Sequence, residues 1–469
     1  MGEQYDTKLE GIDWRYCAAM VGLKLYFDFS NQEYDRITDY EQGQDYLVYN
    51  KSVITKERYL AFAEDYFRED MFHTGIEDIL YGKSEFSEAQ IDMVNAKLTG
   101  NTVMKKVFGK MKFDGTNYDA ILTLINSNRT QIITETFKNK KNLYANYCNT
   151  NLFQEEMSQP HCRLVGYNLD EGRKSRSAAY NFNADSFISA DCIEFDFIPF
   201  SFSNTFEALF INNNWSFLEL CKTNKTFANL VQEEKKEYQV NARNLLFRTI
   251  IEASDFLDYD IEVIIKNRDK EYYETLFIRK KAITILKSLK SINALLKPLK
   301  LNDNYYINIQ EEAVGCIINE VLTDRLIELL LKEETIRHYA IDKLIEINYK
   351  IKGLVEEKGE IVMKAKIYST KKCAEEVVRK IEKNKANKVK AYRQKLTSAI
   401  VAGDYDRFCE ILLQLSSYSE VSFPFSYDLF EDFEKNKELA YTFVAALDPN
   451  APKIGEGQEE TKNKETENN

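Results

Sequence analysis

The sequence is poor in the residues that most often carry catalysis, metal binding and chain breaks. Its 469 residues include only 3 histidines, 2 tryptophans, 6 prolines and 17 glycines. So few histidines leave little room for a histidine-based metal site or acid–base catalyst. Few prolines and glycines disfavour collagen-like, linker-rich and turn-dense all-β chains. We therefore expect neither a metal nor another cofactor.

Targeting segments are also lacking. The stretch Met1–Asp6 does not open a signal peptide, because no basic region followed by an apolar one is present. No run reaches the roughly 18 apolar residues that a membrane span needs. The eight cysteines are scattered and form no CxxC pair, which is typical of small core residues in a reducing compartment. We expect a cytoplasmic protein with no membrane partner.

What is present is a large apolar and aromatic content. Hydrophobic residues make up 44% of the chain, with 29 Tyr and 29 Phe, which is enough for a sizeable core. Alternating or β-rich runs predict strands over 45–50, 192–199 and 260–266. Apolar residues at helical spacing predict helices over 52–70, 216–234 and 272–295.

From about residue 308 the pattern becomes helical throughout. Leu, Ile, Lys and Glu dominate, Gly and Pro are nearly absent, and helices are predicted over 311–333, 335–357, 362–399, 404–415 and 427–447. The polar end of the chain predicts a disordered tail. We therefore expect an α+β fold, with a mixed α/β N-terminal domain over 1–305, a C-terminal helical bundle over 306–447 and the tail over 448–469.

The net charge of −12 conceals two opposite regions. Residues 1–100 hold 20 acidic and 10 basic side chains, whereas residues 351–400 hold 14 basic and 6 acidic ones. The acidic average therefore does not argue against nucleic-acid binding by the C-terminal part.

Two groups of residues have the types found in metal sites. Cys148, His161 and Cys162 lack the close paired spacing of a zinc site. Asp258, Asp260, Glu262 and Lys266 would share one strand face, as in a metal-dependent nuclease, but an exposed polar strand face explains them as well. No phosphate-binding loop, dinucleotide fingerprint or nucleophile elbow is present. We expect no catalytic residues and no enzyme activity.

Two segments of the N-terminal part could contact DNA. Arg173, Lys174 and Arg176 form a small basic loop suited to phosphates, or simply a solvated turn. Asn212, Asn213 and Asn214 could offer amides to base edges, or cap the helix that follows. Lys222 and Lys225 add positive charge on that helix.

The third candidate is the basic helix predicted over 364–395. Its twelve Lys and Arg side chains include Lys383, Lys388 and Arg393. Such a face could follow a phosphate backbone without reading sequence. The alternatives are a solvated charged face and a membrane-surface helix, and the latter lacks a strongly apolar exposed side.

Three segments resemble a known family. The opening Gly11–Leu23 (GIDWRYCAAMVGL) is similar to the N-terminus of the large subunit of type I CRISPR Cascade complexes, particularly those of subtype I-B. Ile198–Phe202 and Phe210–Asn214 resemble central segments of that family, and the order of a mixed domain followed by a helical bundle matches. The chain departs from relatives that carry a paired CxxC zinc element in the N-terminal domain, so no metal is carried over.

The resemblance implies a non-catalytic subunit of an RNA-guided DNA surveillance complex in antiviral defence. Such a subunit assists recognition of the protospacer-adjacent motif, duplex opening and binding of the displaced strand, while base pairing reads the target. Its implied partners are CRISPR RNA, target DNA, other Cascade subunits and a recruited helicase-nuclease. The alternative is a cytosolic helical scaffold that binds only protein partners.

The resemblance also suggests an internal translation start. Lys358, Gly359 and Glu360 precede Met363, and their codons can contain a purine-rich ribosome-binding site. Under this hypothesis Met363–Asn469 is also made as a separate small subunit. The alternative is an ordinary glycine turn followed by a core methionine.

Overall fold

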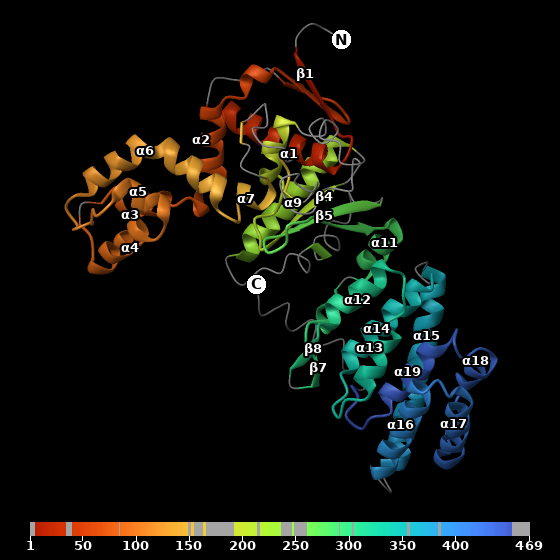
Figure 1. Ribbon diagram of the computed structural model, residues 1–469. Coiled ribbons are helices and arrows are strands. Elements are labelled where there is room, and N and C mark those ends of the chain that lie inside the picture. The colour runs from red at the N-terminus through yellow and green to blue at the C-terminus, as the bar shows by residue number, and fades with distance from the viewer. Residues whose placement is uncertain are drawn as a thin grey trace, which may run out of the picture. The chain divides into compact units, whose positions relative to one another are not determined.

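The computed structural model describes residues 5–33, 40–83, 85–148, 152–153, 163–165, 192–212, 216–235, 246–247, 260–289, 291–302, 304–353, 357–382 and 386–452. The chain divides into two compact units (Figure 1). Unit 1 comprises Met1–Thr249 and Asp260–Ile278, and unit 2 comprises Ile250–Tyr259 and Arg279–Asn469. The domain boundaries expected from the sequence stay a prediction.

The described residues of unit 1 form two small antiparallel sheets. The first has the order β1-β3-β2 and is built from β1 (Thr7–Glu10), β2 (Tyr40–Gln42) and β3 (Tyr46–Tyr49). The second has the order β4-β5-β6 and is built from β4 (Glu207–Asn212), β5 (Ile261–Asn267) and β6 (Glu274–Ile278). Helix α9 (Phe217–Lys235) is joined to β4 through Asn224, which accepts from Ile211 N at 3.0 Å and donates to Ile211 O at 2.8 Å.

The core of unit 1 is formed where α1 (Trp14–Glu33) packs on η4, a 3₁₀ helix over Ile193–Phe200. All residues of η4 from Glu194 to Phe200 are buried. Short elements surround this pair: η1 (Lys51–Val53), α2 (Lys56–Tyr66), η2 (Arg68–Asp70) and α7 (Tyr144–Tyr147). The first two segments that resemble Cascade large subunits therefore meet in one core.

Tyrosines and one arginine satisfy the buried polar groups of η4. Tyr49 Oη donates to Glu194 at 2.8 Å, and Tyr144 Oη donates to Asp196 at 2.6 Å. Arg163, only 2% exposed, donates to both Asp196 carboxylate oxygens at 2.9 Å. Burial nevertheless raises the pKa of Asp196, against the opposing effect of Arg163. These bonds allow two acidic side chains to lie inside an aromatic core.

Four helices of unit 1 form a separate layer, which we call the arm. It consists of α3 (Thr74–Leu80), α4 (Glu88–Thr99), α5 (Thr102–Phe108) and α6 (Tyr118–Asn139) (Figure 1). Its apolar residues form a core cluster distinct from that around η4. The capping box of Ser87 and Gln90 begins α4.

The described part of unit 2 is a helical bundle with one hairpin. The hairpin pairs β7 (Leu299–Asn302) with β8 (Tyr305–Ile307). The helices are α11 (Lys280–Ser288), η5 (Asn293–Leu295), α12 (Ile309–Ile318), α13 (Asp324–Leu331), α14 (His338–Ile351), α15 (Glu357–Glu382), α16 (Ala386–Val401), α17 (Tyr405–Ser419), α18 (Ser426–Glu431) and α19 (Lys437–Ala446). Every residue of α19 is buried, so this helix is the centre of the bundle.

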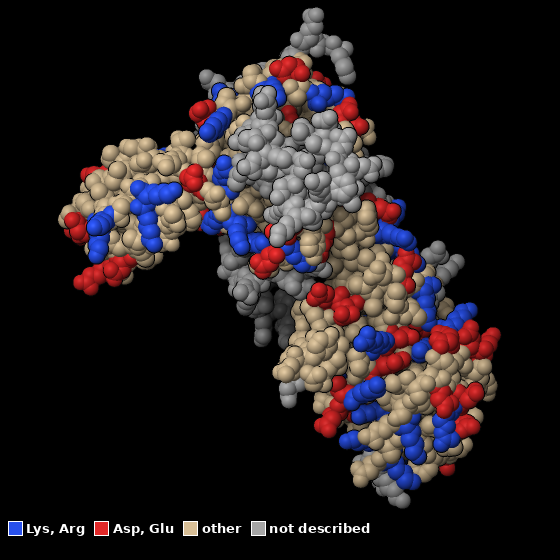
Figure 2. Space-filling model, viewed as in Figure 1, with Lys and Arg blue, Asp and Glu red and all other residues tan. Residues whose placement is uncertain are grey.

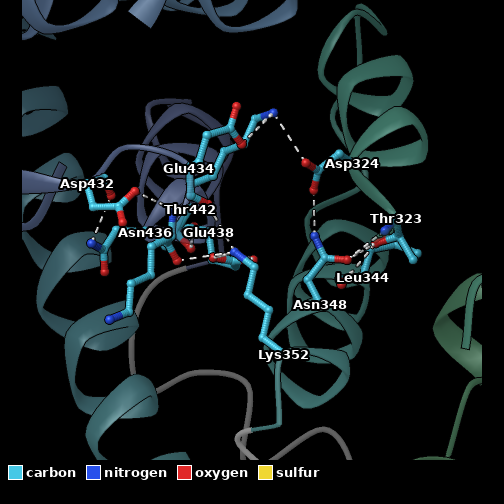
Figure 3. A network of polar contacts seen from close by, with 12 residues as sticks. Thr323, Asp324, Leu344, Asn348, Lys352, Asp432, Glu434, Asn436, Glu438 and Thr442 are labelled. Carbon is cyan, nitrogen blue, oxygen red and sulfur yellow. Dashed lines mark hydrogen bonds and ion pairs between the residues drawn. The ribbon is translucent and has the colours of Figure 1, made fainter. Parts of the chain in front are cut away.

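A polar network joins α19 to the helices around it (Figure 3). Lys352 Nζ lies 2.7 Å from the carboxylate of Glu438, which is fully buried and whose pKa is raised by that burial. Asn348 donates to Asp324 at 2.7 Å and accepts from Thr323 N at 2.7 Å. Buried polar groups that are paired in this way fix one arrangement of the helices.

The expected α+β class with a helical C-terminal region is confirmed, but some element predictions are wrong. The predicted strand 192–199 is the 3₁₀ helix η4, because its residues are enclosed on all sides and the alternation has no exposed face. The predicted helix 272–295 is β6 followed by α11, because residues 274–278 pair with β5. The predicted helix 311–333 is interrupted near Glu320, where φ is +55°.

Candidate nucleic-acid interface

A surface that combines lysine ammonium groups with tyrosine rings, as nucleic-acid binding surfaces do, lies on α16 and α17 of unit 2. Lys388 Nζ lies 4.2 Å from the ring centroid of Tyr418 and donates to its hydroxyl at 2.7 Å. Tyr418 and Tyr392 have ring centroids 6.1 Å apart, and Lys395 Nζ lies 5.8 Å from the Tyr392 ring. We call these four residues the Lys–Tyr surface.

The packing of α17 on α16 presents these side chains at the surface. The buried side of α17 carries Phe408, Ile411, Leu412 and Leu415, whereas Tyr418 is 44% exposed. On α16, Lys388, Tyr392 and Lys395 recur at helical spacing, so they lie along one side of the helix. Figure 2 shows Lys and Arg side chains, with Asp and Glu among them, over the part of the molecule that contains these helices.

The positive charge of this surface is not neutralised by neighbouring acids. Among the described residues, no ion pair involves Lys388, Lys390 or Lys395, and Lys390 and Lys395 are exposed. By contrast, Lys364, Lys366 and Lys371 on α15 are paired with Glu360, Asp428 and Asp342 at 2.6–2.7 Å. In the basic helix predicted over 364–395, most basic side chains on α15 are thus ion-paired, whereas Lys388, Lys390 and Lys395 on α16 are not paired with any described residue.

Arg393, a predicted DNA contact, lies inside the bundle. It is 8% exposed, and its Nη1 lies 3.1 Å from the Asp448 carboxylate. His338 Nε2 lies 3.4 Å from the same carboxylate, and burial lowers the His338 pKa. The charge of Arg393 is therefore neutralised by Asp448 within unit 2, and Arg393 is not part of the Lys–Tyr surface.

The remaining predicted contacts divide into three groups. Arg173, Lys174, Arg176, Asn213, Asn214 and Lys383 lie outside the described residues. Lys222 and Lys225 are exposed on α9. Asn212 is 1% exposed at the end of β4, where its amide donates to Glu262 at 2.8 Å, so this amide is directed into its own sheet.

The carboxylate–lysine group on β5 does not take the form of a nuclease site in the part of the chain described. Lys266 is 2% exposed and donates to Asn146 Oδ1 at 3.3 Å and to Asn267 O at 3.1 Å. Burial lowers the pKa of Lys266 to about 8. Glu262 is bonded instead to Asn212, and Asp258 lies outside the described residues.

One other cluster has metal-ligand residue types. The ligand atoms of Glu64, His73 and Glu77 all lie within 4.8 Å of one another at the base of the arm. The guanidinium of Arg129 is ion-paired with both carboxylates, and His73 Nε2 lies 2.6 Å from Glu64. An arginine in this position supplies the positive charge that a metal would bring. Of the cysteine and histidine residues considered as zinc ligands and judged unsuitable, Cys148 has its Sγ 3.7 Å from Phe195 O, and His161 and Cys162 are outside the described residues.

The sequence prediction included neither Tyr392 nor Tyr418 among the candidate DNA contacts. The available signal was the spacing of Lys388, Tyr392 and Lys395, four and three residues apart, which puts a ring between two ammonium groups on one helix side. The partner ring of Tyr418 comes from another helix, and its proximity depends on tertiary packing.

No helix in the described ranges is both long enough and apolar enough to cross a membrane.

Comparison with known proteins places this chain in a family. No curated protein and no solved structure matches the chain. A family model described as CRISPR-associated protein Csx8 matches residues 5–239 and 229–447, which is most of the sequence. The chain therefore belongs to the CRISPR-associated Csx8 family.

Proposed function

We propose that this Csx8 protein is the non-catalytic large subunit of a type I Cascade complex. In this role it assists recognition of the protospacer-adjacent motif and opening of the duplex, together with CRISPR RNA, the other Cascade subunits and a recruited helicase-nuclease. Membership of a CRISPR-associated family supports the proposal. The proposal is also supported by two segments of this chain that resemble subtype I-B large subunits and that pack together as α1 and η4.

The observation that carries the DNA-binding part is the Lys–Tyr surface. Single-stranded nucleic acid is held by rings on which bases stack and by cations that follow the phosphates. Tyr418 and Tyr392 offer two neighbouring rings, and Lys388 and Lys395 place ammonium groups beside them. Every base has a face that can stack, so this surface suits a displaced strand of any sequence.

A binding experiment on the full-length protein tests this part. We expect Tyr392→Ala combined with Tyr418→Ala to weaken binding of a fluorescent single-stranded oligonucleotide by about 5- to 150-fold, as loss of one stacked base predicts. The matched control is Tyr427→Ala, because Tyr427 is 77% exposed on α18 and makes none of the ring contacts found among the described residues. Equal affinities of the double variant and the control would remove α16 and α17 from the interface.

Purification from the native host tests the rest of the proposal. A Cascade subunit co-purifies with CRISPR RNA and several protein subunits, and the Lys–Tyr variants should leave that assembly intact. Recovery with protein partners but without RNA would instead support the helical scaffold considered from the sequence.

A further inference from the structure

A second basic surface lies on the arm of unit 1. Residues 93–113 contain five lysines and no Asp or Glu, although the first hundred residues as a whole are acidic. Lys105, Lys106, Lys110 and Lys112 are exposed, and none of them forms an ion pair within the described part of the chain. We call these four residues the lysine strip. Lys97 is not included, because its Nζ lies against Gly75 at the start of α3.

The backbone under the lysine strip is held in place by the fold. On α5, Met104 and Phe108 are buried, so Lys105 and Lys106 lie on the other side of the helix. Asn101 caps α5 by accepting from Met104 N at 2.8 Å. Gly109 then ends the helix with a φ of +56°, which favours glycine.

The loop after α5 is fixed just as firmly. Asn95 of α4 donates to Phe113 O at 2.8 Å and accepts from Phe113 N at 2.8 Å. Asn117 donates to Lys112 O at 2.9 Å. Lys110 and Lys112 therefore project from a backbone that does not need to be ordered on binding, which lowers the entropic cost of an interaction.

The lysine strip differs chemically from the Lys–Tyr surface. None of its four ammonium groups lies over an aromatic ring in the described residues. The rings of the arm, such as Phe86 and Phe113, pack against each other with centroids 5.1 Å apart. Cations without a stacking ring suit a duplex, whose bases are already stacked on one another and whose phosphates are exposed. Figure 2 shows Lys and Arg side chains over the arm together with some Asp and Glu.

We propose that the lysine strip binds the phosphate backbone of double-stranded DNA without reading its sequence. This inference rests on the proposed DNA-binding role of the chain, but not on the Lys–Tyr surface. It gives the protein one surface for duplex in unit 1 and another for single strand in unit 2.

The test measures binding of the full-length protein to a fluorescent 30-base-pair duplex over a range of salt concentrations. The variant carries Lys105→Gln, Lys106→Gln, Lys110→Gln and Lys112→Gln. The control carries Lys56→Gln, Lys141→Gln, Lys332→Gln and Lys435→Gln, which are four exposed lysines elsewhere and give the same change in net charge. Thermal melts of both proteins check that each remains folded.

The expected result is a loss of duplex affinity of roughly tenfold or more in the variant but not in the control. Each lost phosphate contact should also reduce the slope of log affinity against log salt by about 0.9, so four contacts reduce it by up to about 3.6. Binding of a single-stranded oligonucleotide should stay within about twofold of wild type.

Three results would overturn the inference: an unchanged duplex affinity and salt slope, an equal loss in the control, or an equal loss of single-strand binding. Failure of the Lys–Tyr variants to affect single-strand binding would count against the proposed displaced-strand role and leave the duplex result standing. The two proposals therefore fail separately.

Discussion

Gly22 and Gly315 both lie inside helices, and the same substitution should change stability in opposite directions at the two positions. A Cβ added to Gly22 of α1 would lie 2.1 Å from Phe197 O and 2.8 Å from Phe197 C. An ordinary carbon–oxygen contact is about 3.3 Å or longer, so α1 and η4 would have to separate by roughly 1 Å. A Cβ added to Gly315 of α12 meets no heavy atom within 4 Å.

The magnitudes follow from this difference. Replacing a helical glycine by alanine normally stabilises a helix by about 0.5–1 kcal/mol, and we expect this gain for Gly315→Ala. At Gly22 the gain is outweighed by overpacking, because Phe197 is itself enclosed by Tyr26, Tyr59 and Phe200. We expect Gly22→Ala to lower the free energy of unfolding of unit 1 by roughly 2–4 kcal/mol.

Urea denaturation measures both effects. Both tryptophans of the sequence belong to unit 1, so indole fluorescence follows that unit, while far-UV circular dichroism also follows the helices of unit 2. A Gly22→Ala midpoint equal to or above that of wild type would refute the close packing of α1 on η4. A loss in Gly315→Ala as large as that in Gly22→Ala would show that the contact with Phe197 is not the cause.

Three further predictions concern buried charges and the boundaries of the bundle. Asp448→Asn leaves Arg393 and His338 without their shared carboxylate, and should lower the free energy of unfolding of unit 2 by about 3 kcal/mol, measured by urea denaturation. The lowered pKa of Lys266 means that the unfolded chain binds more protons between about pH 8 and the usual lysine pKa of 10.5. The free energy of unfolding of the wild type should therefore rise with pH across that window, and Lys266→Met should lack this rise. Parallel pH profiles of the two proteins would contradict the burial of Lys266. A Met363–Asn469 fragment lacks Asp324 of α13 and Lys352, which follows α14, and both are partners of α19, so the fragment should unfold without a cooperative transition when expressed alone. A sharp melt would instead favour the separate small subunit. Its existence is tested by changing the Met363 codon to Leu and blotting for a C-terminal tag.

The sequence was sufficient to predict elements whose pattern is set locally. Helix α9 and the strands β3 and β5 lie where periodicity placed them, because each has a regular apolar pattern of its own type. The errors occur where distant segments decide the structure. Strand β6 exists because β5 lies beside it, and η4 is buried by α1, α2 and α7, which a local window cannot include.

Predictions of the candidate site likewise succeeded where the local sequence decides and failed where distant residues decide. Lysine density marked α16 correctly as basic, but whether a lysine is paired depends on partners far away in sequence, such as Asp342 for Lys371. Arg393 was indistinguishable from its neighbours because only the folded bundle brings Asp448 to it. The lysine strip was missed because charge was totalled only over residues 1–100 and 351–400, and residues 105–112 lie in neither range.

The contact of Gly22 with Phe197 also bears on how genetic data for this family should be interpreted. The segments that resemble Cascade large subunits, in α1 and η4, lie in the interior and do not form the surfaces proposed to bind nucleic acid. Losses of roughly 1–2 kcal/mol change the cellular amount of a protein several-fold. In an interference screen, substitutions in these segments should therefore act as temperature-sensitive alleles that are rescued by overexpression, whereas substitutions of surface lysines should leave protein levels normal.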